Sequence, residues 1–143
     1  MERTPSGSRS AAGRLGVGVT SNEAWVFAQE WAHHWNTRDV EAVLAHFAER
    51  AVFSSPVALK VIGEATIHGK KALRAYWSRA LADHQSLHFT INRALWDANR
   101  SELAIIYDRD VNGRQERGAE VLTFDADGRV ICGEAFYGVI PSP

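Results

Sequence analysis

Residues 102–124, ELAIIYDRDVNGRQERGAEVLTF, decide the fold that this sequence predicts. Apolar and polar residues alternate on both sides of Asn112-Gly113, a pair that favours a two-residue type I′ hairpin turn. With that turn at the centre, residues that face each other across the hairpin have numbers that sum to 225. The predicted pairs are Val111 with Arg114, Arg109 with Glu116, Tyr107 with Gly118 and Ile105 with Glu120.

The two sides of this hairpin differ in what they carry. Side chains alternate across a strand, so one side holds Leu103, Ile105, Tyr107, Arg109, Glu116, Gly118, Glu120 and Leu122. The other side pairs Asp108 with Arg117 and also holds apolar residues such as Ile106 and Val121. We expect both sides to be covered, one by helices and the other by a second copy of the chain.

Helical patterns precede this hairpin. The Thr20–Glu23 spacing fits a capping box and predicts a helix that starts at Ser21. Asp39 is expected to cap a second short helix that includes Phe47 in its apolar pattern, and residues 70–84 predict a third helix. The stretch AVFSSP, 51–56, predicts a short strand that ends at its proline. Residues 58–69 have no clear assignment, although Gly63 and Gly69 suggest an irregular or short-stranded connection.

The strands predicted after the third helix form a meander. Their apolar residues repeat with a period of two, and Asp127-Gly128 marks a further turn. The expected strands span about 86–96, 102–111, 114–124 and 129–140. Three helices that pack on such a curved antiparallel or mixed sheet give an α+β fold.

Composition limits the classes of partner. The chain has 143 residues, enough for one domain, and 16 basic residues balance 17 acidic ones. This balance argues against nucleic acid or an anionic membrane as a partner. No apolar run reaches the roughly 18 residues of a membrane span. The one cysteine, Cys132, is expected to be a buried thiol, so the sequence predicts a soluble protein in the reducing cytoplasm.

The ends of the chain are expected to lie outside the folded domain. Residues 1–20 are rich in serine, glycine and arginine and predict a disordered tail, although their few acids also weakly resemble an organelle transit peptide. The domain is expected to span 21–140. Residues 141–143 form the C-terminal end.

Four stretches carry a resemblance to a known superfamily. They are HFAERAVFSSP at 46–56, GKKALRAYW at 69–77, AEVLTFDADGRV at 119–130 and EAFYG at 134–138. In this order the chain resembles the nuclear transport factor 2 superfamily, and within it the SnoaL-like polyketide cyclases and the ketosteroid isomerases. The resemblance implies a cone-shaped barrel with an apolar cavity open at one end, and a homodimer that forms through the sheet.

The same resemblance implies that the isomerase machinery has been replaced. The position of the isomerase base falls on Ser55, whose hydroxyl is too weak a base near neutral pH. The oxyanion tyrosine falls on Trp31, and the two tyrosines that support it fall on Phe47 and Trp77, so their hydrogen-bond network is absent. The second oxyanion donor, an aspartic acid in the isomerases, falls on Glu120.

Glu120 is therefore the main candidate for chemistry. A carboxylate in an apolar cavity either finds a cation or keeps its proton. The hairpin register pairs Arg109 with Glu116 instead, so Glu120 is expected to have a raised pKa and to act as a hydrogen-bond donor or general acid. His34, three residues after Trp31, is the weaker candidate for a base.

These observations predict a pocket more clearly than a reaction. The expected ligand is a small apolar organic molecule, and any chemistry is cofactor-free acid-base catalysis of the isomerase, cyclase or hydratase type. The alternative is a non-catalytic binding or dimerisation module with a filled cavity. No histidine spacing indicates a metal site. Besides Glu120 and His34, the expected pocket residues are Trp31, Trp35, Ser55, Trp77, Tyr107, Gly118, Ala135 and Tyr137.

Overall fold

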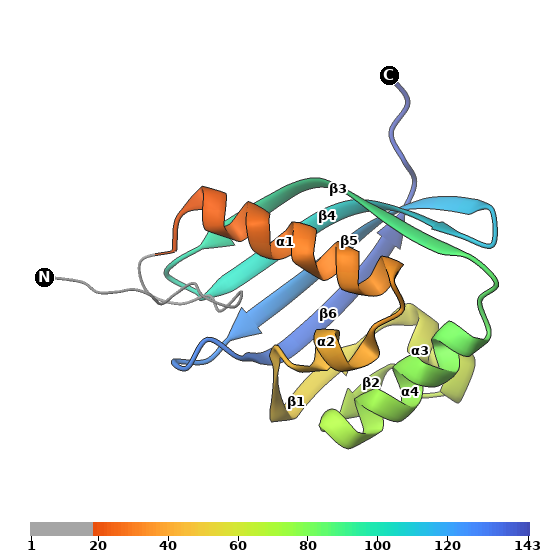
Figure 1. Cartoon of the computed structure of the whole chain (residues 1–143), viewed down its shortest axis with the longest axis horizontal. Helices are drawn as coiled ribbons and strands as arrows, with labels where there is room; N and C mark the ends of the chain where they lie inside the picture. Colours follow the sequence, from red (N-terminus) through yellow and green to blue (C-terminus); the bar gives the residue numbers. More distant parts are fainter. Residues whose placement is uncertain (1–18) are drawn as a thin grey trace, which may run out of the picture.

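A computed structural model describes residues 19–143 of the chain. Residues 1–18, which include most of the stretch expected to be a tail, lie outside the described residues. Helices cover one face of a curved, six-stranded sheet with the order β2-β1-β6-β5-β4-β3 (Figure 1). The predicted α+β fold with a mixed sheet is thereby confirmed.

The order of helices and strands differs from the predicted order, which was three helices followed by a meander. The chain begins with two helices and a strand, continues with a helix, a strand and a helix, and ends in four strands. In chain order they are α1 (Ser21–Asn36), α2 (Val40–Leu44), β1 (Phe47–Ser54), α3 (Pro56–Ile62), β2 (Thr66–His68), α4 (Lys70–Ala82), β3 (Leu87–Asp97), β4 (Glu102–Val111), β5 (Arg114–Phe124) and β6 (Val130–Gly138).

The predicted β4–β5 hairpin is confirmed residue by residue. Asn112 and Gly113 both have positive φ angles, of 54° and 83°, as a type I′ turn requires. The observed register pairs Tyr107 with Gly118 and Ile105 with Glu120. The inner side of the hairpin faces the helices, and its residues Leu103, Ile105, Tyr107, Glu120 and Leu122 are all buried.

Both predicted helix caps are present. The Thr20 hydroxyl accepts a hydrogen bond from the Glu23 backbone N–H, and the Glu23 carboxylate accepts one from the Thr20 backbone N–H, which completes the capping box. The Asp39 carboxylate accepts a hydrogen bond from the Ala42 backbone N–H at the start of α2. Helix α1 then lies against β3.

The region between residues 45 and 69 departs from the prediction. Phe47 does not belong to the second helix but opens β1, which pairs in parallel with β6. Ser55 follows this strand and caps α3, and Pro56 occupies the first turn of the helix. Proline is tolerated there because its missing N–H would have no partner within the helix. The unassigned stretch thus contains a short helix and the edge strand β2.

Cys132 is exposed, so the prediction of a buried thiol is wrong. The pairing between β5 and β6 shifts its register between Thr123 and Phe124, opposite the start of β6. A bulge of this kind changes which residues face inward. Val130 is buried before the shift, Gly133 and Ala135 are buried after it, and Cys132 faces outward with Ile131.

Candidate functional site

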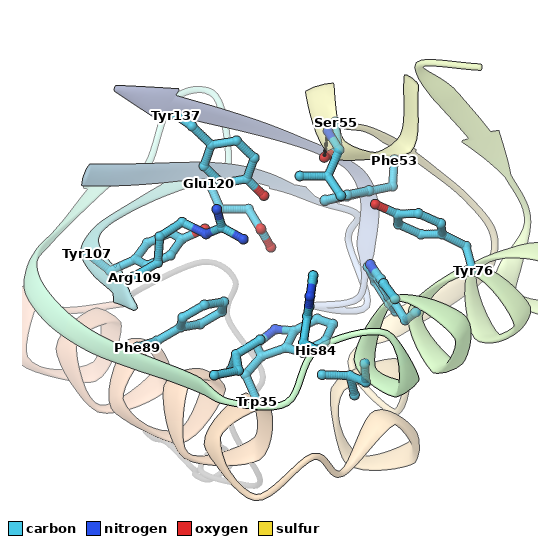
Figure 2. A pocket seen from close by; sticks show the side chains of 15 residues that line it. Trp35, Phe53, Ser55, Tyr76, His84, Phe89, Tyr107, Arg109, Glu120 and Tyr137 are labelled. Carbon is cyan, nitrogen blue, oxygen red and sulfur yellow. Dashed lines mark hydrogen bonds between the residues drawn. The ribbon is translucent and has the colours of Figure 1, made fainter. Parts of the chain in front are cut away.

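A pocket lies between the inner face of the sheet and the helices (Figure 2). Its walls come from α1, β1, α4 and all four strands of the meander, which is why residues far apart in the sequence meet there. The cavity inside these walls, called the inner pocket below, has a volume of about 60 Å³. It is lined by Trp35, Phe53, Ser55, Val57, Tyr76, Trp77, Ala80, Leu81, His84, Leu87, Phe89, Tyr107, Arg109, Glu120 and Tyr137.

Glu120 is the acidic group of this pocket. Its side chain points inward from β5 and the residue is only 5% exposed. Burial raises the pKa of Glu120 to about 8, against smaller lowering effects of the Trp31 indole N–H and the Arg109 charge. The Trp31 Nε1 is buried near the Glu120 carboxyl group, but the two do not form a hydrogen bond of good geometry. Glu120 is therefore mostly protonated at neutral pH and can donate a hydrogen bond.

Arg109 lines the same pocket as Glu120 but is paired with another acid. Its Nη1 lies 2.7 Å from Oε1 of Glu116, as the hairpin register predicts. The guanidinium carbon also lies 4.3 Å from the centre of the Tyr137 ring, a cation–π contact. These contacts hold the Arg109 charge away from an ion pair with Glu120.

Hydroxyl groups gather on the side of the pocket next to Glu120. Burial raises the pKa of Tyr76 to about 12 and raises the pKa values of Tyr107 and Tyr137 as well. The Ser55 hydroxyl, which accepts a hydrogen bond from the Val57 N–H, lies close enough to Tyr76 and Tyr137 to lower their pKa values slightly. All three tyrosines thus keep their protons and act as donors.

His84 lines this pocket, although the sequence analysis singled out His34 instead. Figure 2 shows His84, which follows α4, reaching into the pocket from the side opposite Glu120. Burial, and then the positive charge of Arg109, lower the pKa of His84 below its ordinary value of 6.5. His84 is accordingly neutral at pH 7, and a neutral imidazole can accept a proton.

Six residues predicted for the site lie together in the pocket wall: Trp35, Ser55, Trp77, Tyr107, Glu120 and Tyr137. The aromatic members pack closely. The Trp77 ring is met by the rings of Trp35, Phe47 and Phe53, each with a centroid distance of 5.3 Å. Such packing leaves the interior narrow.

The other four predicted residues lie outside the wall. His34 packs on His46 with a ring centroid distance of 6.1 Å, so it does not reach the pocket. Trp31 lies behind Phe89 and Tyr107, with centroid distances of 5.5 and 5.0 Å. Gly118 leaves room for the Tyr107 ring, not for a ligand. Ala135 is buried beside Glu120 on the neighbouring strand.

The residues that the sequence did not single out had weak signals. Tyr76 stands next to Trp77 in the same apolar helical pattern, and Arg109 shares the inner side of the hairpin with Tyr107. His84 follows the predicted helix in a loop whose direction no local pattern specifies. Within residues 19–143, no three metal-ligating side chains gather in one place, and no helix is long and apolar enough to span a membrane.

Solved structures with the same fold come from several bacteria. A SnoaL-like protein of unknown function from Burkholderia thailandensis is 32% identical, with a TM-score of 0.74, and the match covers 83% of this chain and 97% of that one. A protein with a cystatin-like fold from Methylobium petroleophilum is 23% identical, with a TM-score of 0.67, over 87% of this chain and 81% of that one.

A third similar structure contains a bound ligand. It is a protein with a ketosteroid isomerase-like fold from Catenulispora acidiphila, in complex with trimethylamine. It is 19% identical, with a TM-score of 0.62, over 83% of this chain and 88% of that one. None of the curated proteins is a significant match. Residues 28–132 match the SnoaL-like domain family, and the chain therefore belongs to this family.

Proposed function

We propose that this protein binds a small, largely apolar molecule and that the neutral Glu120 carboxyl group donates a hydrogen bond to it. The observation that carries this proposal is a buried carboxyl group, with a pKa near 8, that lines a pocket and forms no ion pair among the described residues. Burial of a carboxyl group without an ion pair costs stability, and carboxyl groups with strongly raised pKa values cluster at functional sites.

The hydrogen-bond donors of the inner pocket indicate which chemical group the inner end of the ligand carries. At pH 7 Glu120 is protonated by about ten to one, and the buried tyrosine hydroxyls are protonated too. The Trp35 Nε1 lines the same pocket and is buried without an acceptor. The Glu120 carboxyl group and the Trp35 N–H have no hydrogen-bond acceptor among the described residues, so the inner end of the ligand carries one, such as a carbonyl oxygen.

The size of the space specifies how the ligand lies. About 60 Å³ holds a few water molecules or a small end group, but not a large ring system. A second cavity of about 530 Å³, called the outer cavity below, shares Val57, His84, Arg109 and Tyr137 with the inner pocket. The ligand places its acceptor end in the inner pocket and its larger part in the outer cavity.

If the protein turns its ligand over, Glu120 and His84 are the acid and the base. The carboxyl group donates its proton or stabilises a developing oxyanion, and the neutral imidazole on the opposite side accepts a proton. Environments that move the pKa values of two groups apart in this direction are typical of acid-base pairs. The reaction class is cofactor-free isomerisation, cyclisation, dehydration or hydration.

A second candidate function has its own support. The three aromatic rings around Trp77 and the small volume of the inner pocket favour a filled core, and hence a binding or dimerisation module without turnover. A thermal-shift panel of small ketones, lactones and aromatic acids separates the two candidates. A bound ligand raises the melting temperature, whereas a filled core gives no shift.

A pair of variants makes this test specific for the pocket. Ala80 lines the inner pocket from α4, and Ala75 is exposed on the same helix. We expect Ala80→Leu to abolish the shift and Ala75→Leu to retain it. With an identified substrate, Glu120→Gln should reduce turnover at least a hundredfold. Absence of any shift across the panel would favour the filled core, and unchanged turnover would remove Glu120 from the mechanism.

A homodimer through the outer face of the sheet is also part of the proposal. This face carries Leu95, Ala104, Ile106, Ala119, Val121 and Phe136 on neighbouring strands. Leu95 and Phe136 are 54% and 47% exposed, and contiguous apolar side chains on a sheet favour association. A cytoplasmic location is supported by the single cysteine, which has no partner for a disulfide within the chain.

A further inference from the structure

Positive charges surround the outer cavity. Lys60 lines it from α3, Arg114 from the hairpin turn and Arg109 from the floor that it shares with the inner pocket. Glu116 is the one acidic residue in this lining. It is engaged by both arginines, at 2.7 Å from Arg109 and 3.4 Å from Arg114. Three cations and one carboxylate leave a surplus of two positive charges around the space.

Arg109 brings one of these charges to the junction of the two cavities. Its side chain is 11% exposed and stacked on Tyr137, and its Nε is buried with no acceptor in residues 19–143. Among the described residues, only the Nη1 atom of its guanidinium has a hydrogen-bond partner. A nearly buried guanidinium with donors to spare is a strong site for a carboxylate, since it offers charge and directed N–H groups together.

The charge of Arg109 acts throughout the pocket. Burial is the main cause of the shifted pKa values of Glu120 and His84, and Arg109 adds a lowering effect to each. A cationic ligand would meet the same repulsion as a protonated His84. The surplus positive charge of Lys60, Arg109 and Arg114 favours an anionic ligand over a neutral or cationic one in the outer cavity.

We infer that the ligand is a small organic acid whose carboxylate lies in the outer cavity between Lys60, Arg109 and Arg114. This inference rests on the proposed function, because the acceptor end of the ligand still lies in the inner pocket beside Glu120, while its larger apolar part lies in the outer cavity with the carboxylate. The shared walls of the two cavities allow one molecule to reach both sites.

Matched pairs of probes test the charge of the ligand apart from its shape. 4-Acetylphenylacetate, 3-(4-acetylphenyl)propionate and 6-acetyl-2-naphthylacetate, which carry a ketone oxygen at the end opposite the carboxylate, are titrated by calorimetry, each beside its primary amide, into the full chain at 50 mM and 500 mM NaCl. We expect at least one acid to bind ten times more tightly than its amide at low salt, and the difference to shrink at high salt because salt screens the charges.

Two double variants then locate the effect. Lys60→Gln with Arg114→Gln should weaken binding of the acid about tenfold and leave binding of the amide unchanged. Lys71→Gln with Arg79→Gln removes the same charge from exposed positions on α4 and should change neither. Arg109 is left intact because its ion pair with Glu116 is largely buried.

Each contrary result has a distinct meaning. Equal affinity for acid and amide, or equal weakening by both double variants, would overturn the carboxylate site and leave the proposed pocket standing. An absence of binding by all six probes would overturn the proposed pocket together with the carboxylate site.

Discussion

Glu120 shows how far alternation along a strand can define a site. Its inward direction follows from the hairpin register, which also separates it from Arg109 by four residues on the facing strand, about 13 Å. The observed Arg109–Glu116 ion pair agrees with that register. Burial then decides the protonation state, because it raises the pKa of Glu120 by more than the Trp31 N–H and the Arg109 charge lower it.

Glu120 makes stability depend on pH. Its pKa is about 8 in the folded state and near 4.5 in the unfolded state, so the free energy of unfolding falls as pH rises between these values. The full loss is on the order of 5 kcal/mol. Urea denaturation at several pH values should show Glu120→Gln to be more stable than the wild type at pH 8.

The control for this measurement is Glu30→Gln, an exposed position on α1. Its pH curve should follow that of the wild type. A Glu120→Gln curve that runs parallel to the wild type between pH 6.5 and 8 would mean that the carboxyl group is charged in the folded protein.

Gly118 shows a small residue whose purpose the sequence did not reveal. A Cβ atom at this position would lie 2.5 Å from the Tyr107 ring, whereas a Cβ atom at Gly138, on the adjacent strand β6, would meet nothing within 4 Å. The glycine lets the tyrosine ring lie flat over the backbone of the facing strand, and this keeps the tyrosine in the pocket wall.

Adding one methyl group at these two glycines should therefore have different effects. Gly118→Ala displaces the buried Tyr107 ring, so we expect a loss of about 1–3 kcal/mol in the free energy of unfolding. Gly138→Ala should change it by less than about 0.5 kcal/mol. Chemical denaturation measures both, and an equal effect of the two substitutions would contradict the close contact at Gly118.

For helices and strands, the sequence predicted the structure best where a motif is compatible with only one local structure. Asn112-Gly113 and the Thr20–Glu23 capping box specify a turn and a helix start, and both are observed. Ser55-Pro56 has two meanings, because a proline that ends a strand can also open a helix. The left-handed Gly63 at the end of α3 was the further signal for this short helix.

The contact of α1 with the turn before β1 creates a second group that responds to pH. The His46 ring packs edge-on against Phe27, with a centroid distance of 5.0 Å, and stacks on His34. Burial, and then the nearby His34, lower the pKa of His46 to about 4. The folded protein thus resists protonation at this site.

Acidification should accordingly weaken the fold through His46. Between pH 6.5 and 4 the unfolded chain takes up this proton and the folded chain does not, so the free energy of unfolding falls by up to about 3 kcal/mol. His46→Phe should remove this fall, and the exposed control His68→Gln should retain it. Equal acid sensitivity of His46→Phe and the wild type would contradict a buried, neutral His46.

The two pH effects overlap in the whole molecule. Between about pH 4.5 and 6.5, acidification stabilises the protein through Glu120 and destabilises it through His46, so the two effects oppose each other there. Above pH 6.5 only the Glu120 effect remains. Single variants are therefore needed to separate the two contributions.

The architecture as a whole brings the site together. Strand β1 pairs in parallel with β6, so the last strand of the meander lies beside the first strand of the chain. This arrangement brings Ser55 next to Tyr137 and places α3 across from the β4–β5 turn at the outer cavity. The opposite face of the same sheet is left to the apolar residues of the proposed dimer interface.

Dimerisation is tested on this outer face. Phe136 on the outer face is 47% exposed and pairs with Ala119 of the neighbouring strand. Leu59, the control position, is 56% exposed and lies on α3. We expect sedimentation velocity to show a dimer for the wild type and for Leu59→Asp. Phe136→Asp should shift the protein toward the monomer, because a charge in an apolar interface is costly. A monomeric wild type would contradict the interface.

The sequence by itself determined the fold class, the register of the central hairpin and the inward direction of Glu120, because these depend on patterns within a few residues of one another. Only the tertiary structure decided which side chains line the cavity. It brought in His84, Tyr76 and Arg109, left out Trp31 and His34, and turned Cys132 outward at a bulge. These outcomes depend on curvature, bulges and the packing of rings between elements far apart in the chain, and no local pattern records them.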